Sequence, residues 1–280
     1  MTYRTLLVHV DNSDRCRARI ELAAEFAYRF PAHLTGIYLP FHPPGFPDVT
    51  AMGGTGLPPP PAPESDPKRL AQAEQMFTEV CRRQDVSPEW ITPPYEDNPE
   101  MRTHARYADL VIVGQEDRSD PESSPTIGFV ASVVLGGGRP VLILPYAGKL
   151  TTAFKHVLVA WDGGREAARA AADAMPFLRS AKAVDVMHVS RGARPDDLGP
   201  IPGMDIAMYF ARHGVNVTVT PERRTNDVAI GEALLSRAAD LNADLIVMGG
   251  YGHSRMQEWV LGGVTRTMLE AMTVPVLMSH

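Results

Sequence analysis

Regularly spaced glycines near the C-terminus join a predicted strand to a predicted helix. Residues 244–248 form an apolar run typical of a buried parallel strand, and residues 266–272 are predicted to be helical. Gly249, Gly252 and Gly262 lie between them. Glycine lets the backbone approach a ligand closely, and the free N–H groups at the start of a helix carry partial positive charge. This junction is therefore a candidate phosphate-binding site.

The glycines also have a simpler interpretation, because turns after strands often need positive φ. The spacing of the glycines is a more specific indication of a ligand-binding loop than their presence. The pattern is Gly-x2-Gly-x9-Gly, and Gly263, Val264 and Thr265 follow it. The chain has no Gly-Lys-Ser/Thr of a Walker loop, and the spacing differs from the Gly-x-Gly-x-x-Gly of dinucleotide-binding folds. The pattern resembles the nucleotide loop of the universal stress protein family, in which Ser or Thr follows the third glycine.

The resemblance implies that the second half of the chain binds ATP or ADP, with or without Mg²⁺, through the ends of three strands and the glycine loop. The implied residues are Ala160, Asp162, Val189, Met248, Gly249, Gly252, Arg255, Gly262, Gly263, Val264 and Thr265. Gly263 departs from the family pattern because it stands where the family has its first Ser or Thr. The missing side-chain hydrogen bond would weaken phosphate binding by about 0.5–1.5 kcal/mol.

Several of these residues have a structural alternative. The resemblance implies that Asp162 accepts a hydrogen bond from the exocyclic amine of adenine, but aspartate is also a good helix cap. Val189 and Met248 would enclose the base, or they are ordinary core residues. Arg255 would lie beside the phosphates, where a fixed cation is useful, or on a solvated loop face. The sequence leaves these alternatives open.

The chain contains two copies of one unit. Residues 6–11 align with 157–162, and residues 108–114 align with 243–249. Predicted strands alternate with predicted helices in both copies. The predicted strands are 3–11, 33–39, 90–92, 110–113 and 140–144 in the first copy and 156–161, 184–189, 215–220, 245–248 and 275–278 in the second.

This alternation predicts an α/β fold with two doubly wound, Rossmann-like parallel-sheet units fused in tandem, one over residues 1–148 and one over 154–280. The family resemblance further implies that residues 141–144 and 276–278 pair antiparallel. Such pairing would make the chain an intramolecular pseudo-dimer and would close two exposed sheet edges. The sequence leaves open whether two chains form a further homodimer.

The first copy is longer than the second. The two copies are offset by 151 residues at Asp11 and Asp162 but by 135 at Gly114 and Gly249, so the first copy has 16 additional residues. Most of them belong to a proline-rich insertion at residues 40–67, which cannot sustain a helix or a central strand. We interpret it as a mobile surface segment or as a proline-recognition or interface element.

The first copy has also lost the glycine pattern. Asp117 stands where the second copy has Gly252, and Glu116, Asp120 and Glu122 add negative charge nearby. Acidic side chains oppose phosphate binding unless a metal intervenes. We therefore expect only the second copy to bind nucleotide. In the first copy Asp11, which is followed by Asn12 and Ser13, is expected to act as a helix cap.

The amino-acid composition argues against several classes of partner. The 280 residues carry a net charge of −6, with 44% hydrophobic and 21% charged residues, which is typical of a globular protein and argues against a nucleic-acid partner. No apolar run approaches about 18 residues, so we expect no membrane partner and a cytoplasmic protein. Cys16 and Cys81 are expected to be buried thiols rather than a disulfide or metal ligands.

No catalytic set follows from the sequence, which lacks a Gly-x-Ser-x-Gly elbow, a Cys-x-x-Cys motif and a metal-spaced His pair on one helix. We predict a universal stress protein that acts as a stress-response regulator or sensor, with at most slow ATP hydrolysis. One alternative is an interaction protein of the same fold that binds no nucleotide. Another is a nucleotidyl transferase, for which the chain lacks a His-x-Gly-His motif.

We expect Gly252→Asp, which copies Asp117 of the first copy, to abolish nucleotide binding because its carboxylate would repel phosphate. The measurement is the melting temperature with and without millimolar ATP and Mg²⁺. The parent should be stabilised by ATP and the variant should not, while both melt at the same temperature without ligand. Equal stabilisation of the two proteins would mean that the nucleotide binds elsewhere.

Overall fold

The computed structural model describes most of the chain. The described residues are 2–39, 66–93, 98–120, 125–148, 150–191, 203–224, 227–251 and 263–280. Most of the predicted insertion at 40–67 lies outside these ranges. Its last residues begin helix α2 (Pro67–Arg83), where the Asp66 carboxylate accepts a hydrogen bond from the Lys68 N–H at 2.9 Å.

The first half is a doubly wound α/β unit whose strands occur where the apolar runs predict them. Its strands are parallel in the order β3-β2-β1-β4-β5, with bounds β1 (Thr5–Val10), β2 (His33–Tyr38), β3 (Pro88–Ile91), β4 (Leu110–Gly114) and β5 (Val141–Leu144). Helices α1 (Cys16–Arg29) and α2 cover one face, and α3 (Asn98–Ala105) and α4 (Ile127–Gly137) cover the other. The central strands are therefore buried on both faces, which explains their continuous apolar runs.

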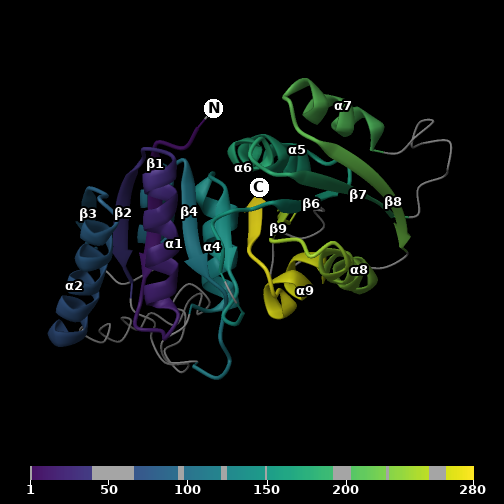
Figure 1. The fold of residues 1–280 in the computed structure, drawn as a ribbon. Coiled ribbons are helices and arrows are strands. Elements are labelled where there is room, and N and C mark those ends of the chain that lie inside the picture. Colours follow the sequence, from purple (N-terminus) through teal and green to yellow (C-terminus); the bar gives the residue numbers. More distant parts are fainter. Residues whose placement is uncertain are drawn as a thin grey trace.

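The second half repeats this arrangement. Its parallel strands have the order β8-β7-β6-β9-β10, with bounds β6 (His156–Trp161), β7 (Ala183–Arg191), β8 (Val217–Arg224), β9 (Leu245–Gly249) and β10 (Val276–Ser279). Helices α5 (Arg165–Asp173), α6 (Met175–Leu178) and α7 (Met204–Arg212) cover one face, and α8 (Asp227–Asp240) and α9 (Gly263–Ala271) cover the other, as Figure 1 shows. The predicted fold of two doubly wound units in tandem is confirmed.

The helical segment after β6 is interrupted in the structure. Helix α5 ends at Asp173, and α6 begins at Met175. Pro176 explains the break, because proline has no N–H to donate and its ring collides with the carbonyl group four residues earlier.

The two halves join where β5 and β10 pair antiparallel. Leu142 lies beside Leu277 in this pairing, and both side chains are fully buried. The ten strands of the described residues consequently form one sheet, with the C-terminal strand at the centre of the molecule (Figure 1). The predicted intramolecular pairing is confirmed.

A cluster of aromatic side chains extends the contact between the halves beyond the sheet. The ring of Phe154, in the connection between the halves, lies 5.6 Å from Phe26 of α1 and 5.0 Å from Phe177 of α6. The Tyr3 hydroxyl donates a hydrogen bond to the Asp173 carbonyl oxygen at 2.7 Å. The halves therefore share a hydrophobic core as well as a sheet.

Both cysteines are buried free thiols, as predicted. Burial raises the pKa of Cys16 to about 12 and that of Cys81 to about 11, so both remain protonated at neutral pH. Among the helices in the described ranges, none has the length and apolar character needed to cross a membrane.

We expect Leu277→Ala to destabilise the whole chain, because it leaves a cavity where the halves join. The expected loss in the free energy of unfolding is about 2–5 kcal/mol. Leu135→Ala is the matched control, because Leu135 is 46% exposed, and it should change the free energy by less than about 0.5 kcal/mol. Urea unfolding measures both, and equal losses would contradict the central position of this pairing.

Candidate functional site

The ends of β6, β7 and β9 meet at one edge of the second half. The parallel register places Trp161 beside His188 and Val159 beside Val247. Asp162 and Gly249 therefore lie at neighbouring strand ends, and Val189 lies two residues before the end of β7. Doubly wound sheets bind their ligands at this carboxyl edge, so the fold brings these three predicted site residues together.

Asp162 is exposed in the turn between β6 and α5. Its Oδ1 accepts a hydrogen bond from the N–H of Gly164, the N-cap residue of α5, at 2.8 Å. Asp162 thus stabilises the turn before the helix rather than capping the helix itself. A carboxylate has several acceptor positions, so the bond to Gly164 does not occupy all of them.

Gly249 ends β9 where the strand meets the start of α5. A Cβ atom here would lie 2.6 Å from the Ala167 nitrogen and 2.8 Å from the Glu166 carbonyl carbon. Both distances are shorter than a side chain tolerates, so the packing of strand against helix requires glycine even without a ligand.

Helix α9 starts within the predicted loop. Gly263, Val264 and Thr265 form its first turn, where N–H groups lack acceptors in their own helix and carry partial positive charge. Thr265 is 3% exposed, and its Oγ1 accepts a hydrogen bond from the Tyr251 N–H at 3.4 Å. This bond holds the start of α9 close to the end of β9. The hydroxyl still has its own hydrogen to donate.

Of the remaining predicted site residues, two pack in the core, one is described only by its backbone, and three lie outside the described ranges. Ala160 and Met248 pack in the apolar cluster on the sheet face covered by α8 and α9, so core packing is observed for both and contact with a base stays a prediction. The structure describes Val189 only by its backbone, which belongs to β7. Three loop residues lie outside the described ranges, namely Gly252, Arg255 and Gly262.

Two polar residues at this edge, Glu166 and His280, were not identified as site residues from the sequence. Glu166, in the first turn of α5, is 5% exposed and forms an ion pair with Arg165. Burial opposes the charge of Glu166, but the hydrogen bond from Arg165 and the nearby His280 hold its pKa below the ordinary value. The His280 Nδ1 lies 3.0 Å from the Gly250 carbonyl oxygen. Glu166 and His280 are far apart in the sequence, and only the fold brings them together.

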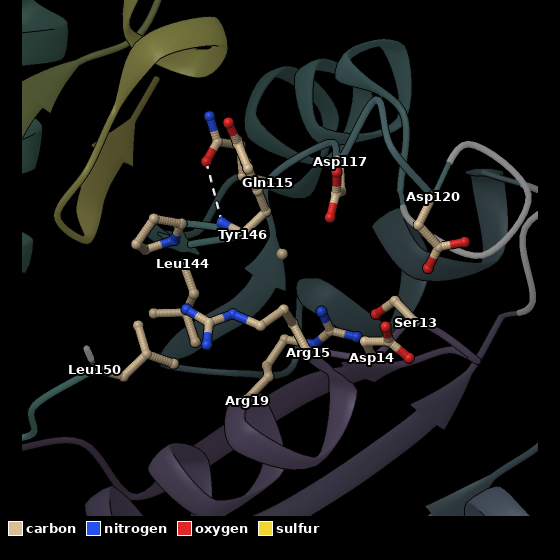
Figure 2. Close-up of a pocket in the computed structure, with 12 residues that line it drawn as sticks. Ser13, Asp14, Arg15, Arg19, Gln115, Asp117, Asp120, Leu144, Tyr146 and Leu150 are labelled. Atoms are coloured by element: carbon tan, nitrogen blue, oxygen red, sulfur yellow. Dashed lines mark hydrogen bonds between the residues drawn. The ribbon is translucent and has the colours of Figure 1, made fainter. Parts of the chain in front are cut away.

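The corresponding edge of the first half contains a pocket. Arg15 and Arg19 lie along one wall, and Asp117 and Asp120 lie across from them (Figure 2). Two of the predicted acidic residues therefore line this edge, as expected, but two arginines face them, which the sequence did not reveal. Within the described ranges, no group of three or more His, Cys, Asp or Glu side chains could hold a metal ion.

Asp11 matches Asp162 in the alignment but lies in a different environment. It is 1% exposed, and its Oδ1 accepts hydrogen bonds from the Ser13 N–H at 3.0 Å and the Ser13 hydroxyl at 2.6 Å. The predicted helix cap is therefore wrong in detail, because the N-cap residue of α1 is Arg15. Asp11 Oδ2 lies 2.7 Å from Arg19 Nη2. Burial alone would raise the pKa of Asp11, but the Arg19 guanidinium outweighs burial and holds this pKa below its ordinary value.

Comparisons with known proteins agree with this architecture. The model of the universal stress protein family matches residues 153–280. The chain is similar to the crystal structure of a universal stress protein from Archaeoglobus fulgidus DSM 4304, with a TM-score of 0.69 and 19% identity over 98% of this chain and 95% of that one. It is also similar to a putative universal stress protein from Pseudomonas aeruginosa UCBPP-PA14, with a TM-score of 0.65 and 14% identity over 99% of this chain and 93% of that one. The comparison with curated proteins found no match.

The fold and its carboxyl edges define an α/β protein made of two Rossmann-like units. Residues 153–280 match the universal stress protein family, and the structural matches show the same two-domain fold over both halves. The predicted family is confirmed for residues 153–280.

His9 should make stability depend on pH. It is 2% exposed, its Nε2 lies 2.8 Å from the Leu39 carbonyl oxygen, and burial lowers its pKa to about 4. An unfolded histidine has a pKa of about 6.5, so protonation favours the unfolded chain, and stability falls as the pH drops from about 6.5 to 4 by about 3 kcal/mol. This part of the pH dependence should disappear in His9→Gln.

Urea unfolding at a series of pH values measures the effect. The control is His156→Gln, because His156 is an exposed histidine, and this variant should keep the pH dependence of the parent. An identical pH dependence in His9→Gln and the parent would show that His9 is not buried in its neutral form.

Proposed function

We propose that the second half, over residues 154–280, binds an adenine nucleotide, ATP or ADP, at the edge formed by the ends of β6 and β9 and the start of α9. The observation that carries the proposal is that an exposed carboxylate, Asp162, and the first-turn N–H groups of α9 lie at the same edge of the sheet. The carboxylate suits the amine of adenine, and the N–H groups suit phosphate. The glycine spacing of the loop, which resembles that of the family, supports the same ligand.

In this proposal the protein is a cytoplasmic regulator or sensor in the stress response rather than a fast enzyme. Phosphoryl transfer needs a cationic clamp, a metal and a positioned base. The candidates from the sequence for such work are Thr265 and Arg255 alone. Mg²⁺ would enter together with the phosphates of ATP, and the first half would contribute structure.

An interaction protein that binds no nucleotide is the second candidate. One observation favours it: Gly263 has no hydroxyl to donate to a phosphate. On this alternative the loop between β9 and α9 is a remnant, and the protein acts through its surface.

Asp162→Ala tests the adenine end of the proposed site. Adenine presents an amino group where guanine presents a carbonyl oxygen, and a carboxylate accepts a hydrogen bond only from the former. We expect the parent to bind ATP more tightly than GTP. The variant should lose affinity for ATP by about tenfold, and with it the preference for adenine. Isothermal titration calorimetry measures the four dissociation constants.

The matched control is Asp14→Ala, which removes an exposed aspartate at the corresponding edge of the first half and should leave ATP binding unchanged. With ATP at about one hundred times Kd, the parent should melt about 5–10 °C higher than without it. Absence of both a binding heat and a rise in melting temperature would favour the interaction protein.

A further inference from the structure

Arg19 is buried against the ligand edge of the first half. Its side chain is 2% exposed, its Nε donates a hydrogen bond to the His9 carbonyl oxygen at 2.8 Å, and its Nη2 lies 2.7 Å from Asp11 Oδ2. The Nη1 atom is so close to Gly114 that a Cβ on this glycine would collide with it. The guanidinium of Arg19 thus fills the space between Asp11 and the end of β4.

The second half has a small apolar residue at the position that corresponds to Arg19. In the alignment that pairs Asp11 with Asp162, Ala170 stands in place of Arg19. Ala170 is 1% exposed, and its side chain is a single methyl group, whereas Asp162 is exposed. The same carboxylate is therefore covered by a cation in one half and accessible to solvent in the other.

We propose that Arg19 is a built-in occupant of the ligand edge of the first half and that it decides which half takes a nucleotide. The second part of this inference rests on the proposed function of the second half. The guanidinium takes at Asp11 the position that the adenine amine would take at Asp162. A contact between guanidinium and carboxylate is stronger than a hydrogen bond from a neutral amine, and arginine does not lose its proton in proteins. A nucleotide therefore does not displace Arg19.

This role differs from that of the acidic residues across the pocket. Asp117 and Asp120 repel phosphate, whereas Arg19 blocks the position of the base. Without the Arg19 side chain, the edge would offer the Asp11 carboxylate, the His9 carbonyl oxygen and the uncovered face of Gly114. Such a site suits a planar group that donates hydrogen bonds, either a guanidinium ion or an adenine ring.

The first test uses Arg19→Ala in the full chain, which copies Ala170 of the second half. Methylguanidinium, which carries the planar cation of the lost side chain, should raise the melting temperature of this variant by about 3–6 °C at about ten times its Kd. It should leave the parent unchanged. Methylammonium has the charge without the planar fork and should stabilise the variant less.

Arg15→Ala is the matched control, because it removes the other arginine of the same pocket while the ion pair of Asp11 and Arg19 remains. Methylguanidinium should leave its melting temperature unchanged. An equal response of the Arg15→Ala and Arg19→Ala variants, or no response of either, would overturn the assignment of Arg19 as the occupant.

The second test counts bound adenosine by isothermal titration calorimetry. Adenosine has no phosphate, so Asp117 and Asp120 do not oppose it. The parent should bind one adenosine per chain and Arg19→Ala should bind two. One adenosine in both proteins would overturn the role of Arg19 in choosing the half. No adenosine in the parent but one in the variant would support the role of Arg19 while contradicting the proposed adenine contact of the second half, so the two failures are distinguishable.

Loss of the buried cation can prevent folding, because it leaves the Asp11 carboxylate without its partner. The double variant Asp11→Asn/Arg19→Ala removes the carboxylate charge together with the guanidinium. The amide keeps an oxygen that accepts hydrogen bonds from the Ser13 N–H and from an adenine amine. This variant should also bind one adenosine more than the parent, and equal binding would overturn the inference.

Discussion

The antiparallel pairing of β5 with β10 is the interaction on which the rest of the structure depends. Each half is a parallel sheet whose last strand would otherwise expose unpaired backbone N–H and C=O groups at an open edge. The pairing joins these two edges and buries Leu142 and Leu277. Because it reverses the strand direction, the carboxyl edges of the two halves point in opposite directions along the shared sheet. The two ligand edges therefore lie apart, and the residues of one can differ from those of the other.

The segment after β4, which replaces the glycine loop in the first half, contacts helix α9 of the second half. Gln115 Nε2 donates a hydrogen bond to the Leu269 carbonyl oxygen of α9 at 2.8 Å. Arg118 Nη2 lies 3.0 Å from Glu270 Oε1, which is also 3.1 Å from Arg266 Nε. Residues that replace the glycine loop in the first half thus hold the far end of the helix whose first turn belongs to the candidate site of the second. The first half thus fixes the position of α9 through a hydrogen bond and an ion pair.

The two halves also show how one neighbour changes the chemistry of an aspartate. Asp11 and Asp162 both follow a central strand, and each accepts a hydrogen bond from the N–H two residues later. What differs is the residue eight positions further on, Arg19 in one half and Ala170 in the other. A buried carboxylate needs a charged partner to stay ionised, and Arg19 supplies it. An exposed carboxylate is hydrated and can accept a ligand instead.

The sequence by itself determined the tandem repeat, the family of residues 153–280 and the approximate positions of the ten strands. The central strands were the clearest, because strands covered on both faces appear as continuous apolar runs between turns. It also contained Pro176, which marks the break between α5 and α6. Most of the loop between Gly249 and Gly263 lies outside the described residues, so its role still rests on the spacing of its glycines.

Only the tertiary structure decided why Gly249 must be glycine and what Arg19 does. Gly249 is required by its contact with the start of α5, more than eighty residues earlier in the chain. Arg19 has the sequence pattern of an ordinary polar helical residue, yet it is one of the largest fully buried side chains. Contacts between residues that are distant in the sequence leave no local periodicity. Their consequences for burial and charge therefore emerge only when the elements pack together.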